Sequence, residues 1–180
     1  MNAAPHTARS LAALVGGCFA VLAIAGAAHA SGAGRASGAA IYSVHCAVCH
    51  QGKGQGVALA FPALADTVGR YLHAPDGREY LVRVVSFGLS GEISSNGVDY
   101  DGVMQSWTQL SDAEIAAVLN HVLTHFNART VPADFKPYTA AEVRRIRTAR
   151  RSFDQVRAER AGILKSLGAS ATAPRAIKAH

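Results

Sequence analysis

The chain has 180 residues, of which 49% are hydrophobic and 17% are charged, and its formal net charge is +6. That length accommodates one domain of ordinary size with an appendage and excludes two large domains, since domains usually run to about 100 to 150 residues. The three cysteines are Cys18, Cys46 and Cys49, which excludes a framework of several disulfides.

Residues 1–30 have the composition of a secretory signal peptide. Arg9 provides a positively charged start, residues 11–25 form an apolar segment, and Ala28-His29-Ala30 is a cleavage site of the small-x-small type. We therefore expect an exported, periplasmic protein that is cleaved after this site. Two alternatives stay open: an uncleaved membrane anchor, and a lipoprotein acylated at Cys18.

Residues 31–129 are predicted to form a mostly helical domain. Small residues along one side indicate a helix over residues 36–46, and apolar positions indicate a second helix around residues 80–87. Residues 88–100 are rich in Gly, Ser and Asn and indicate a loop, in which Asn96-Gly97 is a candidate turn for a short hairpin.

The clearest helix is predicted over residues 111–126. Its apolar side chains recur at the spacing of one helical face. Ser111 and Glu114 have the spacing of a capping box at its start. Because no alternation of strands and helices appears, we expect an all-α fold whose long loops wrap a large internal ligand.

The balance of charge changes near residue 129. Residues 31–127 carry five basic and eight acidic side chains, whereas residues 128–180 carry twelve basic and four acidic ones. We therefore assign residues 130–180 to a basic, partly helical C-terminal extension. Thr139 and Glu142 form a second capping box, followed by a helical stretch with apolar residues on one side: Val143, Ile146, Phe153 and Val156.

The basic extension has three interpretations. We favour a helix that packs on the preceding domain and leaves its charges in solvent. Docking on an acidic redox partner and contact with anionic lipid stay open. A nucleic-acid partner is not expected for an exported protein, in spite of the positive net charge.

Cys46-Ala47-Val48-Cys49-His50 has the spacing of a haem c attachment site. In such a site each thiol adds across one vinyl group of the porphyrin, and the adjacent imidazole reaches the iron. A zinc knuckle would need a second pair of ligands, and a thioredoxin-like pair would need a βαβ context. The sequence offers neither, so we predict one covalent haem c with His50 as an iron ligand.

Met104 is the candidate for the second axial position. The only other methionine is Met1, which would leave with the signal peptide, so a thioether ligand would have to be Met104. We expect it in a loop ahead of the helix that starts at Ser111. The alternatives are ligation by His73 or His45, or an open position.

The order of these features resembles the class I cytochrome c family over residues 36–127. The shared features are a helix before the haem motif, a glycine-rich segment after it, a methionine segment and a capped last helix: Gly38 and Tyr42; Gly52, Gly54 and Gly56; Phe61-Pro62; Gly102-Val103-Met104 with Trp107; and Leu110 to Ile115. The resemblance implies a helical domain wrapped around one haem. It also implies that the Pro62 carbonyl orients His50, and that Tyr42 and Trp107 belong to the cofactor site.

Gln105 is a departure from that family, because relatives commonly have proline directly after the axial methionine. The departure predicts a less rigid methionine segment. The segment from Gly91 to Met104 also resembles monohaem cytochromes that serve periplasmic dehydrogenases, reductases and haem-copper oxidases. We therefore expect a redox protein of one of these kinds as the partner.

The function that the resemblance implies is single-electron transfer, not catalysis. With His50 and Met104 on the iron, no position is open to a substrate. Two alternatives are a haem protein that binds peroxide, NO or CO after Met104 is displaced, and a non-catalytic subunit of a larger oxidoreductase. His121 and His125, four residues apart on the last predicted helix, form a further candidate metal pair.

Overall fold

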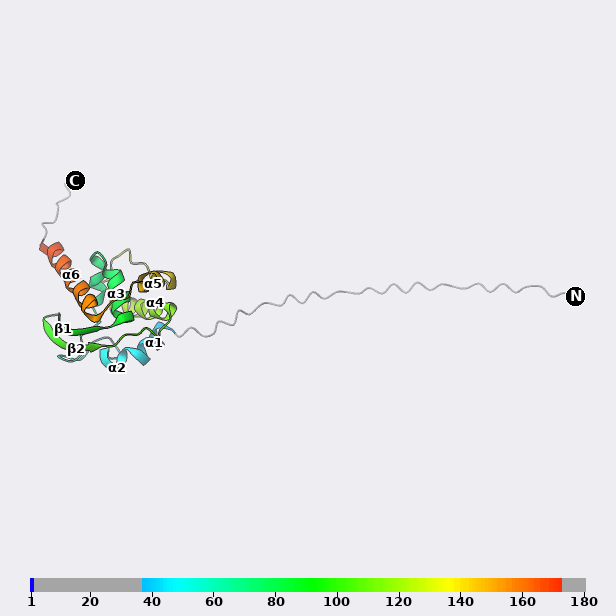
Figure 1. The fold of residues 1–180 in the computed structure, drawn as a ribbon, viewed down its shortest axis with the longest axis horizontal. Coiled ribbons are helices and arrows are strands. Elements are labelled where there is room, and N and C mark those ends of the chain that lie inside the picture. Colours follow the sequence, from blue (N-terminus) through cyan, green and yellow to red (C-terminus); the bar gives the residue numbers. More distant parts are fainter. Residues whose placement is uncertain (2–36, 173–180) are drawn as a thin grey trace, which may run out of the picture. The chain divides into compact units, whose positions relative to one another are not determined.

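The computed structural model describes residues 37–172, together with Met1, and is drawn in Figure 1. Helices dominate this part of the chain, and one antiparallel hairpin accompanies them. Apart from Met1, the predicted signal peptide at residues 1–30 lies outside the described residues. Within the described part, no helix is long and apolar enough to span a membrane.

Helix α1 (Gly38–His45) packs closely against helix α4 (Asp112–His121). A Cβ atom at Gly38 would overlap the carbonyl group of Ala117 on α4. The absence of a side chain at Gly38 therefore lets the two helices approach closely. Ser37 caps α1 by accepting a hydrogen bond from the Ala40 N–H at 3.2 Å.

The helix predicted over residues 111–126 is present, with a wider last turn. The Glu114 N–H donates to the Ser111 hydroxyl at 3.3 Å, and the Ser111 N–H donates to the Glu114 carboxylate at 2.8 Å, which confirms the capping box. Beyond α4 the chain continues as a π-helical turn, η2 (Val122–Phe126).

Asn127 ends this last helix and joins it to a preceding element. Its side chain is fully buried. It donates to the Val122 carbonyl at 3.0 Å and accepts from the Gly69 N–H at 3.0 Å. Gly69 belongs to the 3₁₀ helix η1 (Val68–His73), so one amide side chain holds η1 against the end of the last helix.

Helix α3 (Gly77–Phe87) begins three residues before the predicted 80–87 helix. It ends at Gly88, whose φ of 78° lies in the region that favours glycine. Tyr80, Leu81 and Val82 are buried, so this helix contributes one wall of the interior.

A β-hairpin occupies the segment that was predicted as a loop, so the all-α assignment is corrected to a helix-dominated fold with one hairpin. Strand β1 (Leu89–Ser95) pairs antiparallel with β2 (Val98–Met104), with Leu89 opposite Met104. The turn is the predicted Asn96-Gly97, with φ values of 52° and 77°, as a type I′ turn requires. Gly, Asp and Asn are depleted in strands, and their presence here concealed the two strands.

The extension forms two helices where one stretch was predicted: α5 (Ala140–Arg147) and α6 (Phe153–Thr172). Thr139 caps α5 and accepts from the Glu142 N–H at 3.1 Å. The Glu142 carboxylate pairs with Arg78 at 2.8 Å, so only this half of the predicted capping box is present. The break between the helices leaves Phe153 40% exposed and not on a continuous apolar side.

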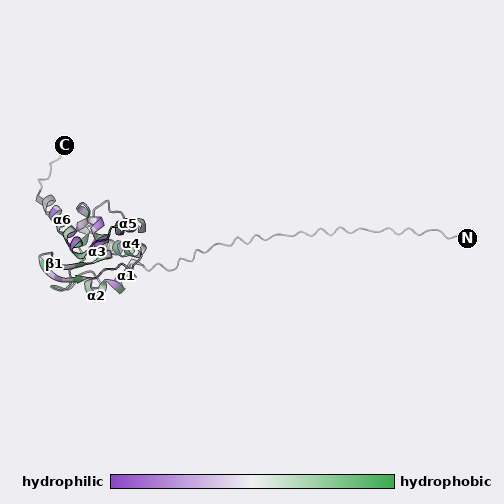
Figure 2. Cartoon of the chain, in the orientation of Figure 1, coloured by the Kyte–Doolittle hydropathy of each residue, from purple (hydrophilic) through white to green (hydrophobic). Residues whose placement is uncertain are grey.

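Both extension helices pack on the preceding elements, as the favoured interpretation predicts. Helix α5 lies against α3 and α4, and α6 lies against α3, β1 and η1 (Figure 1). Val143, Ile146, Val156 and Ile163 are buried in the same core as the residues of α3 and α4. Figure 2 shows both hydrophilic and hydrophobic residues along α6, as expected for a helix with one buried side.

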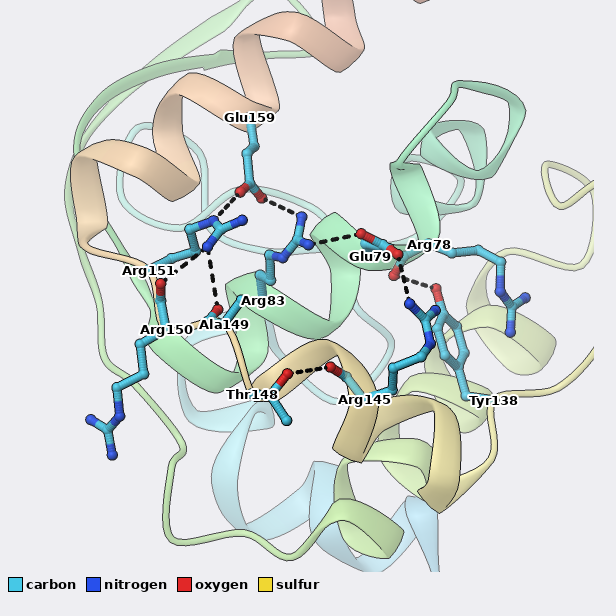
Figure 3. A network of polar contacts seen from close by, with 10 residues as sticks. All are labelled: Arg78, Glu79, Arg83, Tyr138, Arg145, Thr148, Ala149, Arg150, Arg151 and Glu159. Carbon is cyan, nitrogen blue, oxygen red and sulfur yellow. Dashed lines mark hydrogen bonds and ion pairs between the residues drawn. The ribbon is translucent and has the colours of Figure 1, made fainter.

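Ion pairs also join the extension to α3. The prediction that the extension leaves its charges in solvent is therefore wrong for these side chains. Arg83 of α3 contacts Glu79 at 2.7 Å and Glu159 of α6 at 3.3 Å (Figure 3). Glu159 also pairs with Arg151 at 2.7 Å, and Arg145 of α5 reaches Glu79 at 3.3 Å. A network of alternating charges therefore spans α3, α5 and α6.

Candidate functional site

Cys46, Cys49 and His50 lie on and next to the short helix α2 (Ala47–His50). The Cys46 N–H donates to the Tyr42 carbonyl at 2.9 Å and ends α1, and the His50 N–H donates to the Cys46 carbonyl at 2.9 Å. This single turn brings both thiols and the imidazole to the wall of one cavity. Before a haem is attached, burial raises the pKa of Cys46 to about 11, with a further contribution from Cys49.

His50 is held in one orientation and one tautomer. Only 9% of the residue is exposed, and its Nδ1 lies 2.9 Å from the Pro62 carbonyl oxygen. Because a carbonyl can only accept a hydrogen bond, Nδ1 carries the proton and Nε2 keeps a free lone pair. Burial lowers the pKa of His50, and the bond to Pro62 partly opposes this. The imidazole is therefore neutral at neutral pH, which is the form that binds a metal.

Met104 lines the same cavity as His50, and the cavity has a volume of about 400 Å³. It is the last residue of β2 and pairs with Leu89, so its predicted place in a loop is wrong. The strand ladder therefore positions the thioether side chain. Gln105, the residue that departs from the family pattern, follows the strand and also lines the cavity.

The two alternative histidine ligands have different surroundings. The Nε2 atom of His73 lies 2.9 Å from the Thr130 carbonyl, and His73 is not among the residues that line the cavity. His45 does line it, with its ring centroid 4.7 Å from that of Trp107. Trp107 also lines the cavity, and its backbone N–H donates to the Val85 carbonyl at 3.1 Å. The geometry thus favours Met104 or His45 over His73.

Tyr42, which was predicted to belong to the cofactor site, is not among the residues that line the cavity. It is 2% exposed, its hydroxyl donates to the Gln51 carbonyl at 2.7 Å, and its ring packs on Phe126 with a centroid separation of 5.0 Å. Burial raises the pKa of Tyr42 to about 12, which keeps the hydroxyl protonated. Tyr42 therefore braces the chain directly after the haem motif.

The cavity walls suit a large apolar macrocycle. Most of the lining side chains are apolar and come from α3, the hairpin and the last helix: Leu81, Val84, Val85, Leu89, Ile93, Val118, Leu119 and Val122. Polar residues also line it, among them Tyr71, Tyr80 and Arg160. A porphyrin with apolar faces and two carboxylate side chains matches this combination, so the residues fit a haem.

No sequence motif marks Tyr71, Tyr80 and Arg160 as residues of the cavity. Tyr80 stands inside a predicted helix but carries no motif, and Tyr71 lies in η1, for which no helix was predicted. Arg160 belongs to the basic extension, among many other arginines. No local spacing distinguishes it, because its position in the cavity depends on how α6 packs.

The histidine pair on the last helix is close but incomplete as a metal site. The ring centroids of His121 and His125 are 4.4 Å apart. Over residues 37–172, no group of three or more His, Cys, Asp or Glu side chains is placed to hold a metal ion. Burial lowers the pKa of His121, and the neighbouring His125 lowers it further.

Comparison with known proteins places this cavity among haem sites. The cytochrome c family model matches residues 36–126. A cytochrome c-552 of Thermus thermophilus is 48% identical over 126 residues, which covers 70% of this chain and 95% of that protein. A second cytochrome c-552, from a named strain of the same species, is also 48% identical over 126 residues, with 84% of its length covered. The similarity to these relatives thus extends beyond the segment that the family model matches.

Proposed function

This chain belongs to the cytochrome c family and carries haem c through Cys46 and Cys49, and we propose that it moves single electrons in the periplasm with His50 and Met104 as the axial ligands. Bound haem c supplies an iron that accepts and releases one electron. One observation carries the proposed ligation: His50 and Met104 line the same cavity, and the bond to Pro62 leaves His50 Nε2 free.

The chain's own residues explain why the protein transfers electrons and is not an enzyme. Two side-chain ligands would leave no axial position for a substrate. The buried apolar walls of α3 and α4 would restrict the access of water to the iron, and restricted solvent access helps to set the reduction potential of a metal. Pairing of Met104 with Leu89 in the hairpin fixes the backbone of the proposed second axial ligand.

The rim of the cavity offers a place for electron exchange. Val48 and Val103 line the cavity and are 74% and 68% exposed, and Phe61 is 37% exposed. An uncharged rim of this kind suits a small and transient contact. We expect a redox protein to dock here, of the dehydrogenase, reductase or terminal oxidase kind, and we expect the exchange rate to depend weakly on salt.

Export through residues 1–30 belongs to the same proposal. The mass of the purified protein tests it, because cleavage after Ala30, acylation of Cys18 and a retained leader give different masses. Contact of the basic extension with lipid has less support than its packing, since Arg145 and Arg151 are paired with Glu79 and Glu159.

Absorption spectroscopy of the oxidised and reduced holoprotein tests the axial ligands. Iron(III) bound to a thioether is expected to show a weak far-red band, and Met104→Ala should abolish it. His45→Ala is the matched control, because His45 lines the same cavity, and it should leave the band in place.

The same spectra address the ligand-binding alternative. A wild-type spectrum of the high-spin type that changes at once on addition of carbon monoxide would contradict the carrier proposal. A low-spin wild-type spectrum without the far-red band, which becomes high-spin in His45→Ala but not in Met104→Ala, would instead assign the ligand to His45.

A further inference from the structure

Arg160 is a buried cation in the haem cavity. It lies on α6, beyond residues 36–126 that the family model matches, and it lines the same cavity as His50 and Met104. It is 5% exposed, although arginine is mostly found at protein surfaces. The extension therefore reaches into the site that the family domain forms.

The protein partners of Arg160 are neutral. Its Nη2 donates to the Ser94 carbonyl at 2.6 Å and to the Tyr71 hydroxyl at 3.3 Å, and its guanidinium carbon lies 6.0 Å from the centroid of the Tyr71 ring. In the part of the chain that the structure describes, no carboxylate lies within ion-pair distance of Arg160. The adjacent Glu159 pairs instead with Arg83 and Arg151.

A buried guanidinium without a negative partner is unfavourable, because the desolvated charge is not compensated. The neighbouring groups Tyr71 and Tyr80 add hydroxyl donors to the same cavity, with their ring centroids 5.6 Å apart. Burial raises the pKa of Tyr80, with Arg160 acting in the opposite direction. An anion would compensate the charge of Arg160 and accept hydrogen bonds from these donors. Haem carries two such anions, its propionate carboxylates.

We propose that Arg160 binds a propionate carboxylate of the haem, so that helix α6 of the extension completes the haem site. This inference rests on the attachment of haem c in this cavity. The hydrogen bonds to Ser94 and Tyr71 both come from Nη2, so the other N–H groups of the planar guanidinium can face a carboxylate, the group that arginine binds with paired hydrogen bonds. Tyr71 and Tyr80 provide further donors to the same group.

The proposal is tested on the holoprotein with Arg160→Gln, Arg160→Lys and a matched control, Arg157→Gln. Arg157 lies on the same helix but is more exposed and pairs with Asp154 at 2.9 Å. Resonance Raman spectroscopy reads the propionate bending mode, and spectroelectrochemistry reads the reduction potential. Arg160→Gln should shift the propionate mode and lower the potential, because loss of a nearby cation favours the oxidised iron.

Arg160→Lys should shift the propionate mode less, since lysine keeps the charge but lacks the planar fork, and this variant serves if Arg160→Gln does not fold. Arg157→Gln should leave the mode unchanged. An unchanged propionate mode in both Arg160 variants would overturn the proposal, even if the potential falls, because the charge would then act only at a distance. Absence of covalent haem from the wild-type protein would instead refute the attachment on which the inference rests.

Discussion

At the scale of single residues, Tyr42 supports the haem motif without touching the cavity. The residue that accepts its hydrogen bond, Gln51, has a φ of 63°, which is unfavourable for a side chain other than glycine. The bond from Tyr42 therefore supports a strained position directly after His50.

Tyr42→Phe should lower the free energy of unfolding by about 1 kcal/mol, because the Gln51 carbonyl loses its donor while the ring keeps its packing. Guanidinium unfolding of the holoprotein measures the change. The absorption spectrum should stay as in the wild type, since Tyr42 does not line the cavity. A changed far-red band would show that Tyr42 contacts the cofactor after all.

Single residues also show what the sequence can predict. The spacing of Cys46, Cys49 and His50 identifies the cofactor because the chemistry acts between neighbours in the chain. The family resemblance implied the role of Pro62, and the 2.9 Å contact to His50 is present. Arg160 contacts Ser94, which lies 66 residues earlier. No pattern within the extension indicates such a distant contact.

At the scale of elements, the crossing of α1 and α4 depends on Gly38. Gly38→Ala should destabilise the holoprotein by about 1 to 3 kcal/mol, because the added Cβ would overlap the Ala117 carbonyl. This cost exceeds the gain of about 1 kcal/mol that alanine brings to a helix. Thermal unfolding of Gly38→Ala measures the sum of the steric cost and the gain in helix propensity.

Gly162→Ala on α6 is the matched control for this comparison. Apart from its chain neighbours and the backbone of its own helix, no atom of the described residues lies within 4 Å of a Cβ at Gly162. The substitution should therefore stabilise the protein by about 0.5 to 1 kcal/mol through helix propensity alone. Equal effects of the two substitutions would contradict the close contact at Gly38.

The capping box of α4 makes stability depend on pH. Hydrogen bonds from the Ser111 hydroxyl and N–H hold the pKa of Glu114 below its ordinary value. A lowered pKa in the folded state means that the stabilisation is present above the unfolded pKa of about 4.3 and is lost as the pH falls through the folded pKa. Below that range the charged cap no longer contributes.

Glu114→Ala should cost about 0.3 to 1 kcal/mol at pH 7, the usual range for an exposed charge at a helix N-terminus. The difference from the wild type should shrink as the pH falls below about 4. Glu114→Gln keeps the hydrogen-bonding geometry without the charge, so its difference from Glu114→Ala should stay constant with pH. Denaturant unfolding between pH 7 and pH 3 gives the free energy of unfolding of the three proteins. If the wild type and Glu114→Ala depend on pH in the same way, the charged Glu114 side chain does not stabilise the helix.

Prediction at the scale of elements succeeds where the signals are local. The capping box of α4, the Thr139 cap of α5 and the Asn96-Gly97 turn lie within a few residues of the structures they start. The full length of the strands beside that turn was missed, because their Gly and Asp residues are held by the pairing of β1 with β2 and by the packing of β1 against α6.

At the scale of the whole molecule, Glu159 connects the extension to the haem domain. It pairs with Arg83 of α3 at 3.3 Å and with Arg151 at 2.7 Å. The Arg83 side chain is 12% exposed, and its Nε has no partner in the described part of the chain. Loss of Glu159 would leave this arginine with Glu79 as its carboxylate neighbour.

Glu159→Gln should therefore lower the free energy of unfolding by about 1 to 2 kcal/mol, more than an exposed ion pair contributes and less than a fully buried one. High salt should reduce the difference from the wild type, since it screens the partly exposed charges. Asp154→Asn is the matched control on the same helix, because the Asp154 side chain is 82% exposed and its change should stay within about 0.5 kcal/mol. Equal stability of Glu159→Gln and Asp154→Asn would mean that apolar contacts of Val156 and Ile163 hold α6 without help from the ion pairs.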